Sequence, residues 1–173
     1  TSVVTSASSG KEPTFDSRIN YPVMKAVWIS YIDFASILTN KTESQFRKNF
    51  ENVCKNSVDF GLNTVVCQVR IHGDAVYPSQ YFAWSHIIAG LGKNPGYDPL
   101  EYMCKAAHKE GLYIHAWINP YRVATTSSPK KLSKDNPYNK NSSIGFELDS
   151  GIYLNPAKKA ARNLVTNGIA EIV

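Results

Sequence analysis

Polar and apolar residues alternate from residue 113 to residue 119, which is typical of a β-strand. The two kinds fall on opposite faces, with Ile114, Ala116 and Ile118 on one and His115, Trp117 and Asn119 on the other. Pro120 ends the strand, because proline cannot donate a ladder hydrogen bond. The pattern predicts a strand that packs under helices on its apolar face and lines the mouth of a parallel barrel with its polar face.

Two earlier stretches, residues 24–30 and 63–70, predict strands of the same kind. In each of them one face stays apolar while the other becomes more polar toward the carboxyl end, where Gln68 and Arg70 stand in the second strand. This asymmetry is typical of (β/α)-barrels, in which the chemistry sits on the loops that follow the strands.

Helical periodicity follows each predicted strand. A capping residue precedes each of the three predicted helices: Thr42, Asp98 and Asn155. The segments between a strand and the next helix are then loops: residues 31–41 with Asp33, the aromatic residues 71–97 and the polar residues 123–153. A structureless loop as long as residues 71–97 inside a compact domain is usually functional.

Three strand–helix units in succession predict an α/β fold with a parallel sheet. A complete (β/α)8 TIM barrel needs about 250 residues, and this chain has 173. We therefore expect residues 23–173 to form the N-terminal portion of such a barrel, incomplete in this chain, with a small open α/β sheet as the alternative. Residues 1–22 are expected to form a flexible N-terminal tether. The unclosed sheet edges favour self-association.

Composition and charge narrow the range of partners. Hydrophobic residues make up 43% and charged residues 19% of the chain, as in an ordinary globular domain. The net charge of +5 is spread along the sequence, and its densest point is the group Lys130, Lys131 and Lys134 in a polar loop. A solvated loop is favoured over a site for an anionic polymer, so no nucleic-acid partner is expected. A membrane span is not expected either, because the sequence has no run of about 18 apolar residues.

The cysteines and the loop histidines point to no metal or cofactor. The cysteines stand in predicted helices and a strand, and we expect buried free thiols: Cys54, Cys67 and Cys104. The loop and surface histidines show no partners at metal-ligand spacing: His72, His86 and His108. No glycine-rich loop joins a strand to a helix start, so a bound nucleotide is not expected.

Five motifs at or beside the predicted strands resemble the glycosyl hydrolase-like family 10. They occur in the family's order: residues 27–30, 63–70, 73–79, 95–100 and 115–122. The resemblance implies a TIM barrel, glycoside hydrolase activity and peptidoglycan glycan strands as the polysaccharide substrate. It also implies an extracytoplasmic protein of the bacterial envelope, secreted or lipid-anchored at the cell surface. Family members continue into a fourth strand and an acidic Asp-Asp-Tyr-type motif, so the resemblance places the main catalytic acids beyond Val173.

Asp74 is the best-placed candidate for a catalytic carboxyl group in this chain. It lies four residues past Arg70, and the other loop carboxylates are Asp33, Glu147 and Asp149. Glycoside hydrolysis uses two carboxyl groups about 5–9.5 Å apart, and a strand end is where a barrel enzyme would hold one. The alternative role for Asp74 is that of a turn residue.

Eight further residues are expected to bind the substrate: Gln68, Arg70, Tyr77, His115, Trp117, Asn119, Tyr121 and Arg122. Arg70 either pairs with a carboxylate inside the barrel or grips an oxygen of the ligand. His115 is either a satisfied core residue or a partner for a sugar hydroxyl or a carboxylate. Trp117 either stacks on a pyranose ring or fills the barrel.

Two functions fit these residues. The first is a glycoside hydrolase, or a fragment of one, that acts on bacterial cell-wall glycan strands held at the carboxyl ends of the barrel strands. The second is a non-catalytic carbohydrate-binding or interaction module that keeps the groove without the catalytic acids. Release of fragments from a glycan separates the two, because a binding module would hold the glycan without cleaving it.

Overall fold

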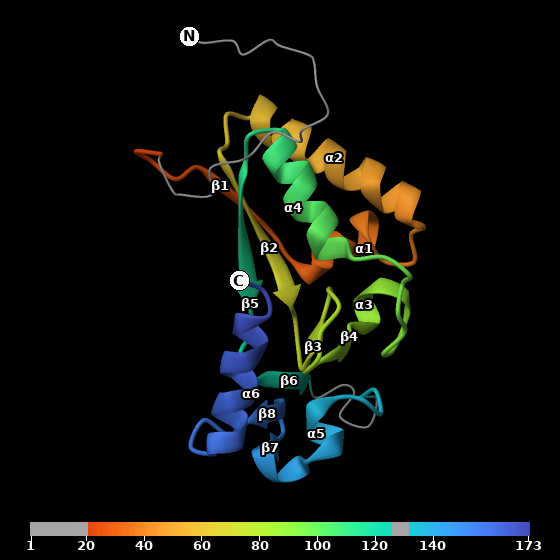
Figure 1. The fold of residues 1–173 in the computed structure, drawn as a ribbon, viewed down its shortest axis with the longest axis vertical. Helices are drawn as coiled ribbons and strands as arrows, with labels where there is room; N and C mark the ends of the chain where they lie inside the picture. Colours follow the sequence, from red (N-terminus) through yellow and green to blue (C-terminus); the bar gives the residue numbers. More distant parts are fainter. Residues whose placement is uncertain (1–20, 126–131) are drawn as a thin grey trace.

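The three predicted strands form one parallel sheet. The computed structural model describes residues 21–125 and 132–173. In these ranges the strands of the sheet follow the order β1 (Ala26–Ile29), β2 (Thr64–Arg70) and β5 (Tyr113–Ile118). Both pairings are parallel, as predicted, and the strands of the described ranges form no closed barrel (Figure 1).

Two helices cover one face of this sheet, α2 (Glu43–Asp59) and α4 (Pro99–Lys109) (Figure 1). Their predicted caps are confirmed. Thr42 and Gln45 form a capping box, and Asp98 accepts hydrogen bonds from the first backbone amides of α4. The main core lies between the helices and the sheet, where these side chains are buried: Phe46, Phe50, Cys54, Val65, Cys67, Val69 and Met103. The opposite face of the sheet carries Trp28, Val66 and His115 in register.

The loop predicted for residues 31–41 is wrong, because α1 (Tyr31–Ile37) occupies most of it. The Ser30 side chain accepts a hydrogen bond from the Ile32 amide, and the Asp33 carboxylate accepts one from the Ser30 amide at 2.8 Å. This capping box starts the helix directly after β1, and it explains why Asp33 points back to the chain.

The long segment after β2 also contains short elements. They are β3 (Asp74–Ala75), β4 (Ala83–Trp84) and α3 (His86–Ala89), and β3 pairs with β4 in parallel. The prediction of a structureless loop is therefore wrong for this segment. Two-residue strands and a four-residue helix are too short to produce a periodic pattern in the sequence.

The polar loop predicted for residues 123–153 is wrong as well. A second, antiparallel sheet contains β6 (Arg122–Thr125), β8 (Gly151–Leu154) and β7 (Gly145–Leu148) in that order. Before β7 lie α5 (Pro137–Lys140) and the 3-10 helix η1 (Ser142–Ile144). A separate small core joins this sheet to α6 (Lys159–Ala170) and includes Val123, Ile152 and Val165.

The last helix begins later than predicted. Asn155 does not cap α6; its side chain accepts a hydrogen bond from the Ala157 amide at 2.9 Å and closes a turn before the helix. The end of α6 contacts the segment after β2. Glu171 accepts hydrogen bonds from the Ser79 hydroxyl and from the Gln80 amide.

The remaining predictions concern the tether, the lysines, the cysteines and the membrane. Residues 1–20 of the expected tether, and Lys130 and Lys131, lie outside the described residues. The cysteines are free thiols as predicted, although Cys104 is only partly buried. None of the helices between residues 21 and 173 that the structure describes has the length and apolar character needed to cross a membrane.

Candidate functional site

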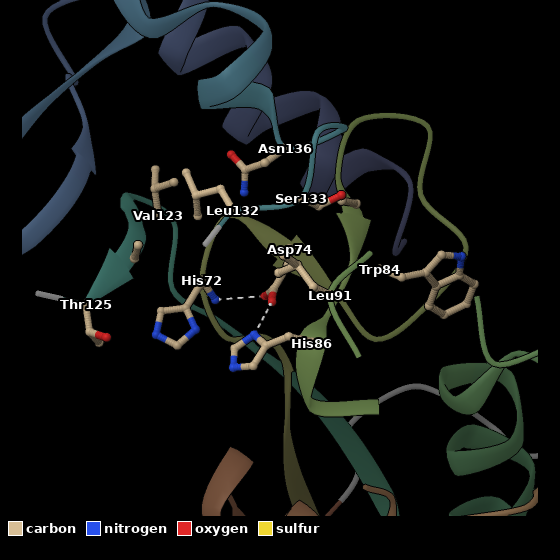
Figure 2. Close-up of a pocket in the computed structure, with 12 residues that line it drawn as sticks. His72, Asp74, Trp84, His86, Leu91, Val123, Thr125, Leu132, Ser133 and Asn136 are labelled. Atoms are coloured by element: carbon tan, nitrogen blue, oxygen red, sulfur yellow. Dashed lines mark hydrogen bonds and ion pairs between the residues drawn. The ribbon is translucent and has the colours of Figure 1, made fainter. Parts of the chain in front are cut away.

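A cavity of about 340 Å³ lies just beyond the carboxyl end of β2 (Figure 2). Its lining comes from the segment after β2, from β6 and from the segment before α5: His72, Asp74, Ala83, Trp84, His86, Leu91, Val123, Ala124, Thr125, Leu132, Ser133 and Asn136. The carboxyl ends of parallel strands are where barrel enzymes place their active sites. The cavity therefore occupies the position at which the sequence predicts the chemistry.

Asp74 is the carboxylate of this cavity. It begins β3, is only 7% exposed, and accepts a hydrogen bond from the His72 backbone amide at 3.1 Å. Its Oδ2 atom lies 3.4 Å from Nδ1 of His86. Burial alone would raise the pKa of Asp74, but hydrogen bonds from His86 and Ser85 and the nearby His72 outweigh it and lower the pKa below its usual value. Asp74 is therefore ionised at neutral pH and is unsuited to be a general acid.

Two histidines lie beside this carboxylate (Figure 2). His86 opens α3, its side chain is 48% exposed, and its hydrogen bond to Asp74 raises its pKa. His72 follows β2, and burial lowers its pKa, which favours the neutral imidazole. One donor atom from each of His72, Asp74 and His86 lies within 4.8 Å of the other two. The expectation that His72 and His86 lack partners at metal-ligand spacing is therefore wrong.

Arg70 and Tyr77 lie away from the cavity, beneath α6. Arg70 is 1% exposed, and its guanidinium carbon lies 3.9 Å from the ring centre of Phe82. Burial lowers the pKa of Arg70, whereas the neighbouring Tyr77 acts in the opposite direction. The Tyr77 hydroxyl donates a hydrogen bond to the Gly168 carbonyl at 3.3 Å. Both side chains are thus enclosed by protein.

Gln68 and Asn119 hold the backbone at the carboxyl end of the sheet. The Gln68 side-chain oxygen accepts a hydrogen bond from the Tyr31 amide at 3.0 Å. The Asn119 amide group donates one to the Ile71 carbonyl at 2.8 Å. These contacts fix the start of α1 and the start of the segment that leads to the cavity.

Trp117 and His115 lie on the face of the sheet that α2 and α4 leave open. Trp117 packs edge-on against Trp28 with ring centroids 5.1 Å apart, and its indole N–H donates to the Asn119 side chain at 3.2 Å. Trp28 is 62% exposed. His115 is partly buried and stands in register with Val66 on the same face. This face is an aromatic surface separate from the cavity lining.

Tyr121 and Arg122 lie at the surface, where the chain passes from β5 into β6. The Tyr121 carbonyl accepts a hydrogen bond from the Leu154 amide at 2.8 Å, and Arg122 stands opposite Tyr153 in the antiparallel sheet. The structure therefore distributes the predicted site residues over several places, and Asp74 is the one among them that lines the cavity.

The other carboxylates considered are engaged or exposed. Asp33 belongs to the capping box of α1, and Glu147 accepts a hydrogen bond from the Tyr138 hydroxyl at 3.3 Å. Asp149 is exposed in the turn between β7 and β8. None of the three lines the cavity that contains Asp74.

Sequence reasoning missed His72, His86 and Asn136 as parts of the site. The His72-x-Asp74 spacing is visible in the sequence, and it could have drawn attention to His72. His86 comes close to Asp74 only through the pairing of β3 with β4, and Asn136 only through its hydrogen bond to the Gly73 carbonyl at 2.7 Å. Neither contact has a local sequence signal.

The chain is similar to known glycosyl hydrolases in sequence. The profile of the family described as glycosyl hydrolase-like 10 matches residues 23–173. The chain is 35% identical to glycosyl hydrolase YngK of Bacillus subtilis over 158 residues. This alignment covers 87% of this chain and 30% of YngK. It is also 35% identical to glycosyl hydrolase DigH of Escherichia coli K12 over 139 residues. That alignment covers 74% of this chain and 31% of DigH. The chain thus spans about three tenths of the length of these relatives.

The fold is similar to that of solved glycoside hydrolases. The maltogenic α-amylase AmyB of Thermotoga neapolitana superposes with a TM-score of 0.52 at 14% identity, over 86% of this chain and 37% of that one. At this identity the likeness concerns the fold alone, which is mixed α/β and of the kind found in TIM-barrel glycoside hydrolases. With the profile match over residues 23–173, the resemblance drawn from the strand motifs is confirmed: the chain belongs to the glycosyl hydrolase-like 10 family.

Proposed function

We propose that residues 23–173 form the N-terminal portion of a (β/α)8 barrel whose complete form hydrolyses bacterial cell-wall glycan strands. The observation that carries the proposal is the buried carboxylate of Asp74 in the wall of a cavity at the carboxyl end of β2, in a member of a glycosyl hydrolase-like family. The cavity volume of about 340 Å³ falls in the range of about 300–1,000 Å³ typical of small-molecule sites.

The chemistry divides between two carboxyl groups. Retaining and inverting glycosidases both need one protonated acid and one ionised partner, which acts as nucleophile or base. A lowered pKa suits Asp74 for the ionised role. We propose that the acid belongs to an acidic motif after a fourth strand, as the family resemblance implies.

The aromatic face of the sheet supplies the contacts for sugar rings. The Trp28 and Trp117 rings are nearly perpendicular, and the Trp28 ring, which is 62% exposed, is proposed to stack on a pyranose. His115, in β5, and Tyr121 and Arg122, after its carboxyl end, are proposed to contact sugar hydroxyls. Gln68, Arg70, Tyr77 and Asn119 are proposed to act through the backbone and the side chains that they position.

A location outside the cytoplasm belongs to the same proposal, because peptidoglycan lies there. Secretion or a lipid anchor would bring the protein to this substrate. Protease treatment of intact cells checks the location, since a protein at an accessible cell surface is degraded while cytoplasmic markers survive.

The function is tested by incubating the full-length protein with purified, peptide-free glycan strands and analysing the products by mass spectrometry. The proposal predicts soluble glycan fragments that accumulate with time. Strands that carry intact peptides serve as the comparison substrate. Binding of the glycan without any release would favour the alternative of a non-catalytic carbohydrate-binding module.

A further inference from the structure

Three metal-ligand side chains converge on the wall of the cavity beyond β2. Figure 2 shows the rings of His72 and His86 next to each other on one side of the Asp74 carboxylate. The Oδ2 atom of Asp74 lies 3.4 Å from Nδ1 of His86, and the two imidazole rings have centroids 5.9 Å apart. One donor atom from each of the three residues lies within 4.8 Å of the other two.

These distances suit a small divalent ion. Zinc binds imidazole nitrogen and carboxylate oxygen at about 2.0–2.2 Å, so its tetrahedral ligand atoms lie about 3.4 Å apart. The contact between Asp74 and His86 already has this length. The widest spacing of 4.8 Å must shorten by somewhat more than about 1 Å, and the half-exposed His86 side chain is able to rotate.

The surroundings orient the carboxylate before any ion arrives. The Oδ1 atom of Asp74 accepts the hydrogen bond from the His72 backbone amide at 3.1 Å, and Ser85 also bonds the carboxylate. Oδ2 is therefore directed toward His86. Hydrogen bonds of this kind to a ligating carboxylate are the usual support of a metal site.

The His72 ring provides an independent observation. Its Nδ1 atom is buried and has no hydrogen-bond partner among the described residues. Buried polar atoms are almost always bonded, so an unsatisfied ring nitrogen beside an ionised carboxylate indicates a partner that the protein does not supply itself.

We propose that His72, Asp74 and His86 bind one divalent transition-metal ion such as zinc at the wall of the cavity. Two imidazoles and one carboxylate are the donor set of ions that accept nitrogen ligands, and three protein ligands leave a position open toward the cavity for water or a sugar hydroxyl. The metal site does not depend on the glycosidase proposal, but with zinc bound Asp74 would hold the ion and would not act as the nucleophile or base assigned to it there.

The test is metal binding by the purified full-length protein, without a histidine tag and freed of metal by a chelator. Isothermal titration with zinc chloride should show one tight site. Magnesium and calcium prefer oxygen ligands and should not compete with zinc for it. His72→Ala and His86→Ala should each weaken zinc binding by at least about tenfold. His108→Ala, on α4 and outside the cavity, should bind zinc like the unaltered protein.

Two further measurements keep the result decisive. Circular dichroism checks that each variant is folded, and His86→Ala is the safest variant because the side chain is half-exposed. Anomalous scattering at the zinc edge locates the ion. Zinc binding that is unchanged in both histidine variants, or no binding by the unaltered protein, would overturn the proposal and leave an Asp74–His86 pair without metal. Either result is separate from glycan release, which is measured on the same protein without added metal.

Discussion

At the scale of single residues, burial and hydrogen-bond partners decide what each candidate side chain is able to do. The polar end of β2 predicted both Asp74 and Arg70 as site residues. Asp74 does line a cavity, whereas the Arg70 side chain is enclosed against Phe82. Gln68 and Asn119 are bound to backbone groups, so they position the site and need not touch a ligand. The alternation along a strand predicts which face a residue occupies, but not which partner it finds there.

Cys54 should be unreactive in the folded protein. Burial, which is the main cause, and the nearby Glu110 and Glu51 raise the pKa of its thiol to about 12, so at pH 8 almost no reactive thiolate is present. Iodoacetamide at pH 8 should therefore modify Cys104, which is partly exposed, before Cys54. Mass spectrometry of the labelled peptides measures both rates. Equal rates in the native protein, compared with the same reaction in denaturant, would contradict the burial of Cys54.

At the scale of elements, the sequence predicts those whose signals are local. The parallel strands and the helices α2 and α4 follow from periodicity and from the caps Thr42 and Asp98. The antiparallel sheet β6–β8–β7 was missed because its strands have only four residues each, and because β6 pairs with β8 across a long distance in sequence. The sequence predicted the strand end at which the cavity lies but not the residues that line it, because part of the lining comes from these unpredicted elements.

The packing of α6 over Arg70 gives a prediction at this scale. A Cβ atom added at Gly168 would meet the Phe82 ring and the Arg70 guanidinium, so Gly168→Ala should destabilise the protein by about 1–3 kcal/mol through overpacking. An alanine at an ordinary position in the helix would instead be about 1 kcal/mol more favourable than glycine. Chemical denaturation measures the change.

Asn167→Ala is the matched control, because Asn167 is exposed on the neighbouring position of α6. It should leave stability unchanged or raise it slightly, since alanine has the higher helix propensity. If Gly168→Ala is as stable as this control, α6 does not pack closely over Arg70.

At the scale of the whole molecule, the described strands form an open sheet. The strands β1 and β5 each have one unpaired edge in this sheet, and Trp28 is exposed on the face opposite α2 and α4. In a closed barrel these edges and this face would be covered by further strands and interior side chains. The covering elements therefore decide whether the aromatic face is an interior or a binding surface.

The open sheet predicts self-association of the 173-residue chain in solution. Light scattering after size-exclusion chromatography should give a mass above that of a monomer, and the mass should rise with concentration. Trp28→Ser should lower it by removing the exposed ring from the sheet face. Phe60→Ser is the control, because Phe60 is 83% exposed at the end of α2, away from that face. A monomeric mass at every concentration would show that the open edges and the exposed face of the sheet do not cause association.

If the carboxylate of Asp74 takes part in glycan hydrolysis, Asp74→Asn in the full-length protein should lower kcat/KM for glycan release by about 100-fold or more. The melting temperature of the variant confirms that it is folded. Asp59→Asn, which alters an exposed carboxylate at the end of α2 before β2 begins, should keep full activity. Glycan release at the unaltered rate by a folded Asp74→Asn variant would show that this carboxylate has no part in the hydrolysis.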